Sequence, residues 1–196
     1  MRLSSLLAGA ILAWLSPAFA GVTIHFKGTV ADDASVQKVT DAACAEAQKN
    51  SWQCKPVLGD EIAQLDGITA KSISKLENSV DFNGVKGVVV LMNEMSEPLY
   101  LVFGPSRRIE NFVKTQFAGA DVHIQAVELL QRIKPFFATL EVIDEGGYWD
   151  TKDRSKLEKE LAGVDAMMSK IKSERSNVQG PVKRPDGRIL DLVGKK

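Results

Sequence analysis

The chain has 196 residues, and its 25 Lys and Arg balance 25 Asp and Glu, so the formal net charge is zero at neutral pH. Without a basic excess there is no global field to attract nucleic acid or an anionic membrane surface, and we predict no nucleic-acid partner. The length suits one domain with a full hydrophobic core.

The first twenty residues have the layout of a secretory signal peptide. Arg2 supplies a cation, residues 6–15 form an apolar run, and the small residues Ala18 and Ala20 follow. The run is about ten residues long, half of what a membrane-spanning helix needs, and an uncleaved membrane anchor is the alternative. We therefore expect cleavage between Ala20 and Gly21, a periplasmic or secreted location and no stable membrane insertion.

Two cysteines follow that segment, Cys44 and Cys54. In an exported protein an isolated pair is most simply a disulfide. Closing so short a loop is worth roughly 3 kcal/mol in the chain-entropy model. A metal pair or a reactive thiol is the alternative, but no histidine lies nearby in the sequence. We predict a structural disulfide, no metal site and no cofactor.

The expected elements begin with a strand at residues 21–26, where GVTIHF alternates and contains β-branched residues. A helix is expected over residues 34–49, with Asp33 or Ser35 as its N-terminal cap. Residues 59–81 show only a loose apolar period. That stretch favours short helices or irregular structure.

Residues 88–113 carry the clearest β signal. Apolar runs at 88–92, 99–103 and 109–113 are separated by residues that favour turns. This pattern predicts three strands joined as an antiparallel meander.

Two helices and one more strand are expected after the meander. The helix over 121–134 should end at Pro135, and ATLEVI at 138–143 is typical of a strand. Over 153–173 apolar residues recur every three or four positions. This spacing predicts a helix packed on a sheet, with a coiled-coil seam as the alternative.

Strands and helices are thus mixed without regular alternation. The sequence predicts an α+β fold, in which an antiparallel meander sheet is packed on one side by helices, as a single domain over residues 21–175. Residues 176–196 contain GPVKRPDGR and end in two lysines. Their composition is typical of a flexible basic tail.

The segment DEGGYWDT, residues 144–151, gathers carboxylates, two aromatic rings and a glycine pair after an apolar run. One interpretation is a strand-to-helix connection, in which the glycines take unusual backbone angles and Tyr148 and Trp149 close the core. Asp150 or Asp153 would then cap the following helix. The other interpretation is an acidic, aromatic cleft that binds a partner.

His123, with Asp144 or Glu145, is the candidate for an acid–base pair. Residues at helical spacing from His123 are Ala126 and Val127, so the sequence has no metal pair of the HExxH kind. A structural histidine at the start of a helix is the simpler interpretation. The sequence also has no GxSxG elbow and no phosphate loop.

Lys114 and Gln116 stand between an expected strand and the next helix. Polar residues at such junctions often line a pocket, although turns and caps use them equally well.

Three stretches, EPLYLVF, VKTQFAGADVHIQAVELL and LEVIDEGGYWDT, together resemble a group of bacterial proteins of unassigned activity. That group shares an EPL hairpin, a KTQFAG segment with a following histidine, and DEGxYWET. The resemblance covers residues 87–161, with Asp150 in place of glutamate and Lys152 in place of glycine. It implies that one constellation includes Lys114, Gln116, His123, Asp144, Glu145, Tyr148, Trp149 and Asp153.

The leading hypothesis is a non-enzymatic exported protein, immunity-like in character, that binds a protein partner. Its expected binding residues are Lys114, Gln116, Glu145, Tyr148, Trp149, Asp150 and Asp153. The alternative is a small extracytoplasmic hydrolase or lyase that uses His123 with Asp144 or Glu145 as acid and base. A third possibility is a structural protein that oligomerises through the helix over 153–173 and the basic tail. The sequence leaves the oligomeric state open.

Overall fold

The computed structural model describes residues 21–59 and 61–195. The predicted signal peptide, residues 1–20, lies outside the described residues, which begin at Gly21, the residue after the expected cleavage site. Within the described ranges, no helix combines the length and the hydropathy that crossing a membrane requires.

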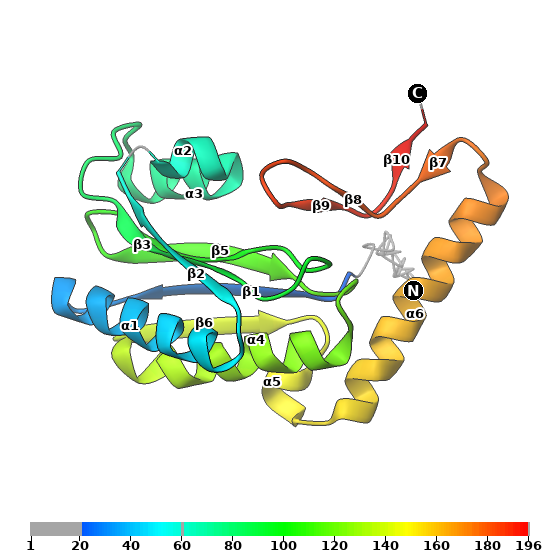
Figure 1. Ribbon diagram of the computed structural model, residues 1–196, viewed down its shortest axis with the longest axis horizontal. Coiled ribbons are helices and arrows are strands. Elements are labelled where there is room, and N and C mark those ends of the chain that lie inside the picture. Colours follow the sequence, from blue (N-terminus) through cyan, green and yellow to red (C-terminus); the bar gives the residue numbers. More distant parts are fainter. Residues whose placement is uncertain (1–20, 60, 196) are drawn as a thin grey trace, which may run out of the picture.

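Two three-stranded antiparallel ladders form the centre of the molecule (Figure 1). The first has the order β5 (Arg108–Lys114), β1 (Thr23–Thr29) and β6 (Thr139–Asp144). The second has the order β2 (Gln53–Leu58), β3 (Lys86–Leu91) and β4 (Leu99–Phe103). The α+β class is confirmed. The three strands predicted over residues 88–113 are β3, β4 and β5, but β5 forms its ladder with β1 and not with β4.

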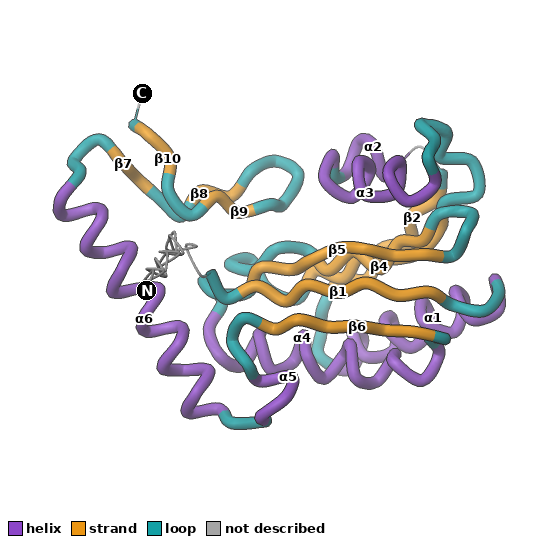
Figure 2. The backbone as a smooth tube through the Cα atoms, turned by 180° about the vertical axis from the view of Figure 1, so that it is seen from behind, coloured by secondary structure: helices purple, strands orange, loops and turns teal. Residues whose placement is uncertain are grey.

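Helices lie on both sides of this central layer, whereas the sequence predicted them on one side only (Figures 1 and 2). On one side are α1 (Asp33–Lys49), α4 (Gly119–Ile133) and the short 3-10 turn η1 (Lys134–Phe136). On the other side are α2 (Glu61–Leu65) and α3 (Gly67–Glu77), which cover the ladder of β2, β3 and β4. On that second side no helix of the described chain lies over β1 and β6 (Figure 2).

The side-chain patterns of the strands explain this unequal cover. In β3, Val88 and Val90 join the core under α1 and α4, whereas Val89 joins the core under α3. A strand buried on both faces reads as one continuous apolar run. In β1, by contrast, Phe26 is buried while His25 and Lys27 are exposed. β5, β1 and β6 therefore have one face that is open to solvent, which we call the open face.

The first helix is fixed at both ends. Asp32 caps α1, and not Asp33 or Ser35 as predicted, because its extended backbone lets the carboxylate accept the N–H of Ser35 at 2.7 Å. The predicted disulfide between Cys44 on α1 and Cys54 on β2 is present. It holds the end of the helix against the edge of the second ladder.

The chain after β6 turns away from the sheet. The short helix α5 (Tyr148–Thr151) ends at Lys152, whose φ of 56° lies in the left-handed region. The long helix α6 (Arg154–Glu174) then leaves the body of the molecule at a steep angle (Figure 1). We predicted that this helix would lie on a sheet, but its buried Leu157 and Leu161 pack beside α4 instead.

Residues 176–195 fold back from the end of α6 and pack on the domain, and we call them the C-terminal arm (Figure 1). The arm contains β7 (Val178–Gln179), β8 (Val182–Lys183), β9 (Ile189–Leu190) and β10 (Val193–Gly194). β7 pairs with β10, and β8 pairs with β9. The structure thus differs from the flexible basic tail predicted for this segment. One residue, Arg188, explains the difference.

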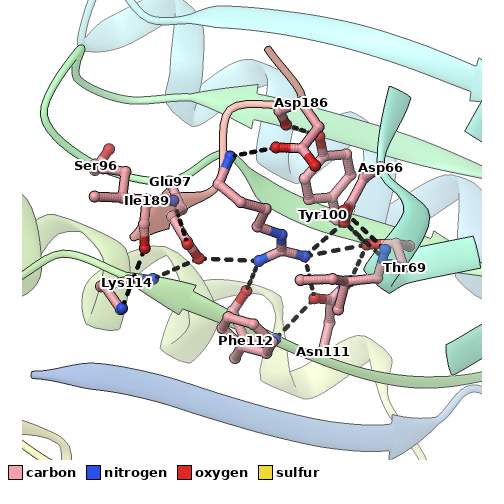
Figure 3. Close-up of polar contacts among 12 residues, drawn as sticks. Asp66, Thr69, Ser96, Glu97, Tyr100, Asn111, Phe112, Lys114, Asp186 and Ile189 are labelled. Carbon is pink, nitrogen blue, oxygen red and sulfur yellow. Dashed lines mark hydrogen bonds and ion pairs between the residues drawn. The ribbon is translucent and has the colours of Figure 1, made fainter. Parts of the chain in front are cut away.

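Arg188 anchors the arm, since only 2% of this residue is exposed. Its Nη2 donates to Asp66 Oδ2 at 2.6 Å and its Nη1 donates to Glu97 Oε2 at 3.0 Å. The same guanidinium donates to the carbonyl oxygen of Phe112 and to Oδ1 of Asn111, each at 3.0 Å (Figure 3). The C-terminal arm is therefore attached to the domain through a side chain that lies in the interior.

Charge pairing keeps these buried groups ionised. Burial acts to raise the pKa of Asp66, but the hydrogen bond and the charge of Arg188 outweigh it, so this pKa lies below its ordinary value. Burial acts to lower the pKa of Arg188, but Asp66 and Glu97 outweigh it and raise that pKa. Burial, with the negative charge of Asp66, also raises the pKa of the neighbouring Tyr100 to about 12.

The first prediction concerns this anchor. Arg188→Met would leave Asp66 and Glu97 buried without their cation, and breaking a buried ion pair on one side costs about 3–5 kcal/mol of unfolding free energy. Arg184 on the same arm pairs with Asp186 at the surface, so Arg184→Met is the matched control and should cost less than about 1 kcal/mol. Urea unfolding measures both. Equal losses in the two variants would contradict the anchor role.

Candidate functional site

The segment DEGGYWDT is a strand-to-helix connection. β6 ends at Asp144, and Gly147 has a left-handed φ of 71° immediately before α5. A Cβ atom on Gly146 would lie 2.6 Å from Cδ1 of Leu157, so the connection packs too closely on α6 for a larger residue. Asp153, one of the two predicted caps, accepts the N–H groups that begin α6.

His123 and Asp144 lie together beneath this connection. Nε2 of His123 is 3.0 Å from Oδ1 of Asp144, and Nδ1 is 2.7 Å from the hydroxyl of Thr115. Asp144 also accepts the N–H groups of Gly146 and Trp149, each at 2.8 Å. Burial acts to raise the pKa of Asp144, but the imidazole and the two N–H groups outweigh it and lower this pKa.

The His123–Asp144 pair has no exposed side-chain surface. A general acid or base must reach the atom from which it moves a proton. The carboxylate of Glu145, the other candidate, lies elsewhere, since it accepts the N–H of Thr23 at 3.0 Å and approaches His25 at 3.6 Å. The geometry thus gives the acid–base alternative no support and assigns His123 and Asp144 to holding the connection.

The two aromatic rings of the connection are half-buried. Trp149 packs against the main core, and the Nζ atoms of Lys134 and Lys152 each lie 5.5 Å from the centre of its ring. Tyr148 packs against both the main core and the cluster beside α6. Asp150 is exposed next to them. These residues close the end of the core, and neither ring lines a hollow described below.

Lys114 and Gln116 hold the C-terminal arm. Nζ of Lys114 lies 2.7 Å from Oδ1 of Asp191, and Nε2 of Gln116 donates to the same oxygen at 3.0 Å. On its other side, Gln116 accepts the N–H of Val22 at 2.9 Å. The residues that the resemblance placed in one constellation therefore divide into those that hold the arm, those that hold the connection, and Glu145, whose carboxylate contacts β1.

A row of side chains on the open face was missed by our sequence analysis. The register sets His25 of β1 between Phe112 of β5 and Ile143 of β6. The rings of His25 and Phe112 are 5.7 Å apart, and 68% of Ile143 is exposed. The strict alternation of TLEVID, in which Ile143 has the parity of the exposed residues, is the signal that could have revealed it.

A charged row runs beside the first. Lys27 of β1 lies between Glu110 of β5 and Glu141 of β6, and its Nζ is 2.9 Å from Oε2 of Glu141. Together with α3, these two rows enclose a hollow of about 360 Å³ that also reaches Ile68 and Ser72. The open face thus combines an apolar row with an acidic border.

A second hollow, of about 520 Å³, lies between α6 and the C-terminal arm, and we call it the α6 groove. Lys114, Gln116 and Asp191 line it where the arm meets the sheet. Its apolar lining comes from both sides of the groove: Val164, Met167, Met168 and Ile171 of α6, and Val178, Ile189, Leu190, Leu192 and Val193 of the arm.

Within the described residues, no group of three or more His, Cys, Asp and Glu side chains is placed to hold a metal ion. Comparison of the chain with protein-family models, with curated proteins and with solved structures gave no match. The functional argument therefore depends on the surfaces themselves.

The second prediction concerns the pH dependence of the connection. Because the folded-state pKa of Asp144 is below its ordinary value, the carboxylate stabilises the fold above about pH 4 and loses this contribution as the pH falls further. Asp144→Asn should cost about 1.5–3 kcal/mol at pH 7, and its difference from wild type should shrink below pH 4. Urea unfolding from pH 7 to pH 2 measures both quantities.

Asp150→Asn is the control for that experiment, because Asp150 is exposed in the same connection. We expect it to change the unfolding free energy by less than about 0.5 kcal/mol at every pH. A difference for Asp144→Asn that stays constant down to pH 2 would contradict the role given to its carboxylate.

Proposed function

We propose that the protein is an exported binding protein, periplasmic or secreted, which recognises a basic, extended segment of a protein partner on its open face. Export is supported by the disulfide between Cys44 and Cys54, which suits an oxidising compartment, and by the signal-peptide pattern of the sequence. The observation that carries the binding proposal is the exposure of Ile143 within an ordered row.

Ile143 differs from an isolated apolar residue on a surface. It adjoins the ring of His25, which in turn adjoins the ring of Phe112 in the same row, and Ile68 of α3, which is 37% exposed, borders the same hollow. Apolar surface gathered within a polar border is typical of a site that binds another protein. The hollow can therefore receive an apolar side chain of the partner.

The charges around this row favour a basic partner. Two carboxylates, those of Glu110 and Glu141, flank Lys27, which already pairs with Glu141, and a third, that of Glu145, approaches His25. Lys or Arg side chains of a partner would be attracted to the remaining carboxylates. Of the residues predicted from sequence to bind a partner, Glu145 is the one that borders the open face.

The edge of β6 favours an extended segment. The N–H of Glu145 donates to the carbonyl oxygen of Thr23 at 3.1 Å, so by alternation the main-chain groups of Leu140 and Val142 point away from β1. Within the described chain, no side chain or turn is hydrogen-bonded to these groups. A partner strand added here would place alternate side chains on the open face.

The third prediction tests this surface by affinity capture from periplasmic and secreted fractions. Ile143→Glu would put a carboxylate into the apolar row, and we expect it to abolish recovery of the partner. We expect recovery from wild type to fall as salt is raised, because the attraction is between exposed charges. Mass spectrometry of the eluted proteins makes the comparison.

Met167→Glu is the matched control, since it makes the same kind of change at an exposed apolar residue on α6, where Met167 is 43% exposed. Recovery should be retained in this variant and in Trp149→Ala. If no protein depends on Ile143 for its recovery, the proposed binding surface is wrong.

A further inference from the structure

The α6 groove has the form of a small-molecule site and is separate from the open face. Its volume of about 520 Å³ falls in the range of about 300–1,000 Å³ that is usual for ligand pockets. One wall is a stripe of α6 residues at helical spacing, namely Val164, Met167, Met168 and Ile171. The stripe makes that wall continuous and apolar over two turns of the helix.

The apolar lining is accessible as well as continuous. Met167 on one wall is 43% exposed, and Leu190 on the other is 42% exposed. Methionine side chains are flexible and adapt to irregular apolar ligands. A narrow chain could thus lie along the stripe and cover side chains that now face solvent.

Cations predominate around the groove. Arg175, at the end where α6 joins the arm, is exposed and makes no ion pair within the described residues. Lys114 is paired with Asp191, the acidic residue of the lining. The cleavage expected before Gly21 would add an α-ammonium group at the same groove, since Gly21 is part of the lining.

The position of that amino terminus is fixed by packing. The N–H of Val22 donates to Oε1 of Gln116 at 2.9 Å, and a Cβ atom on Gly21 would lie 2.6 Å from the same oxygen. Gln116 itself is only 5% exposed. A processed chain would therefore keep its terminal ammonium group beside the apolar stripe.

We propose that the α6 groove binds an amphiphile with one apolar chain and an anionic headgroup. The chain lies along Met167 and Ile171, and the headgroup lies at Arg175. An anion is favoured because the one acidic residue of the lining is already paired, whereas Arg175 is not. The proposal is independent of the function proposed for the open face.

The fourth prediction uses two probes with the same chain, dodecanoate and dodecan-1-ol, below the concentrations at which they aggregate. The protein is purified after export, and mass spectrometry confirms that it begins at Gly21. Titration calorimetry should show one molecule of dodecanoate bound per chain, more tightly than dodecan-1-ol. Absence of dodecanoate binding would overturn the proposal.

Four variants divide the site into its parts. Arg175→Gln should weaken dodecanoate binding by about fivefold and leave dodecan-1-ol unchanged, whereas Lys172→Gln, an exposed cation near the same end of α6, should change neither. Met167→Glu should weaken both probes by about tenfold or more, because it puts a carboxylate beside the chain. Ile143→Glu, on the open face, should leave both unchanged.

Each outcome is decisive for one part of the proposal. Equal effects of Arg175→Gln on the two probes would overturn the headgroup assignment. Dodecanoate binding that survives Met167→Glu would place the ligand outside the α6 groove and overturn the site. Because partner capture depends on Ile143 and amphiphile binding on Met167, failure of one proposal leaves the other standing.

Discussion

The pairing of Arg188 with Asp66 and Glu97 is the interaction on which the rest of the structure depends. Asp66 caps α3 through its contacts with the first N–H groups of that helix, and Glu97 accepts the N–H of Ile189 on the arm. One guanidinium thus joins the start of α3, the loop before β4 and the end of the chain (Figure 3). Because a buried carboxylate without its cation is strongly destabilising, the arm is held to the domain through this cluster.

The same guanidinium links the interior to both proposed surfaces. It lies 4.4 Å from the ring of Phe112, which in turn adjoins His25 on the open face. By fixing the arm, Arg188 also places Asp191 against Lys114 and forms one side of the α6 groove. The open face and the groove are therefore separate in their chemistry but share one structural support.

Local patterns predicted the elements of this fold well, because strand alternation, Pro135 and the cysteine pair act through near neighbours in sequence. The arm could not be predicted in this way, since Arg188 finds Asp66 and Glu97 at separations of 122 and 91 residues. The pairing of β5 with β1 and the exit angle of α6 are likewise decided by tertiary packing. The role of DEGGYWDT could not be predicted for the same reason. Its composition is compatible with a cleft, but the rings of Tyr148 and Trp149 pack against apolar residues of the core.

The distribution of carboxylates explains why the open face is the stronger candidate for binding a protein. Asp66, Glu97 and Asp144 are already engaged by buried donors, so they are unavailable to an external ligand. Glu110 and Glu145 stay at the surface around the apolar row of Ile143. Arg188 is buried together with two carboxylates, those of Asp66 and Glu97, so burial of this cluster does not make the surface more acidic. The acidic character of the open face comes instead from the local positions of Glu110, Glu141 and Glu145.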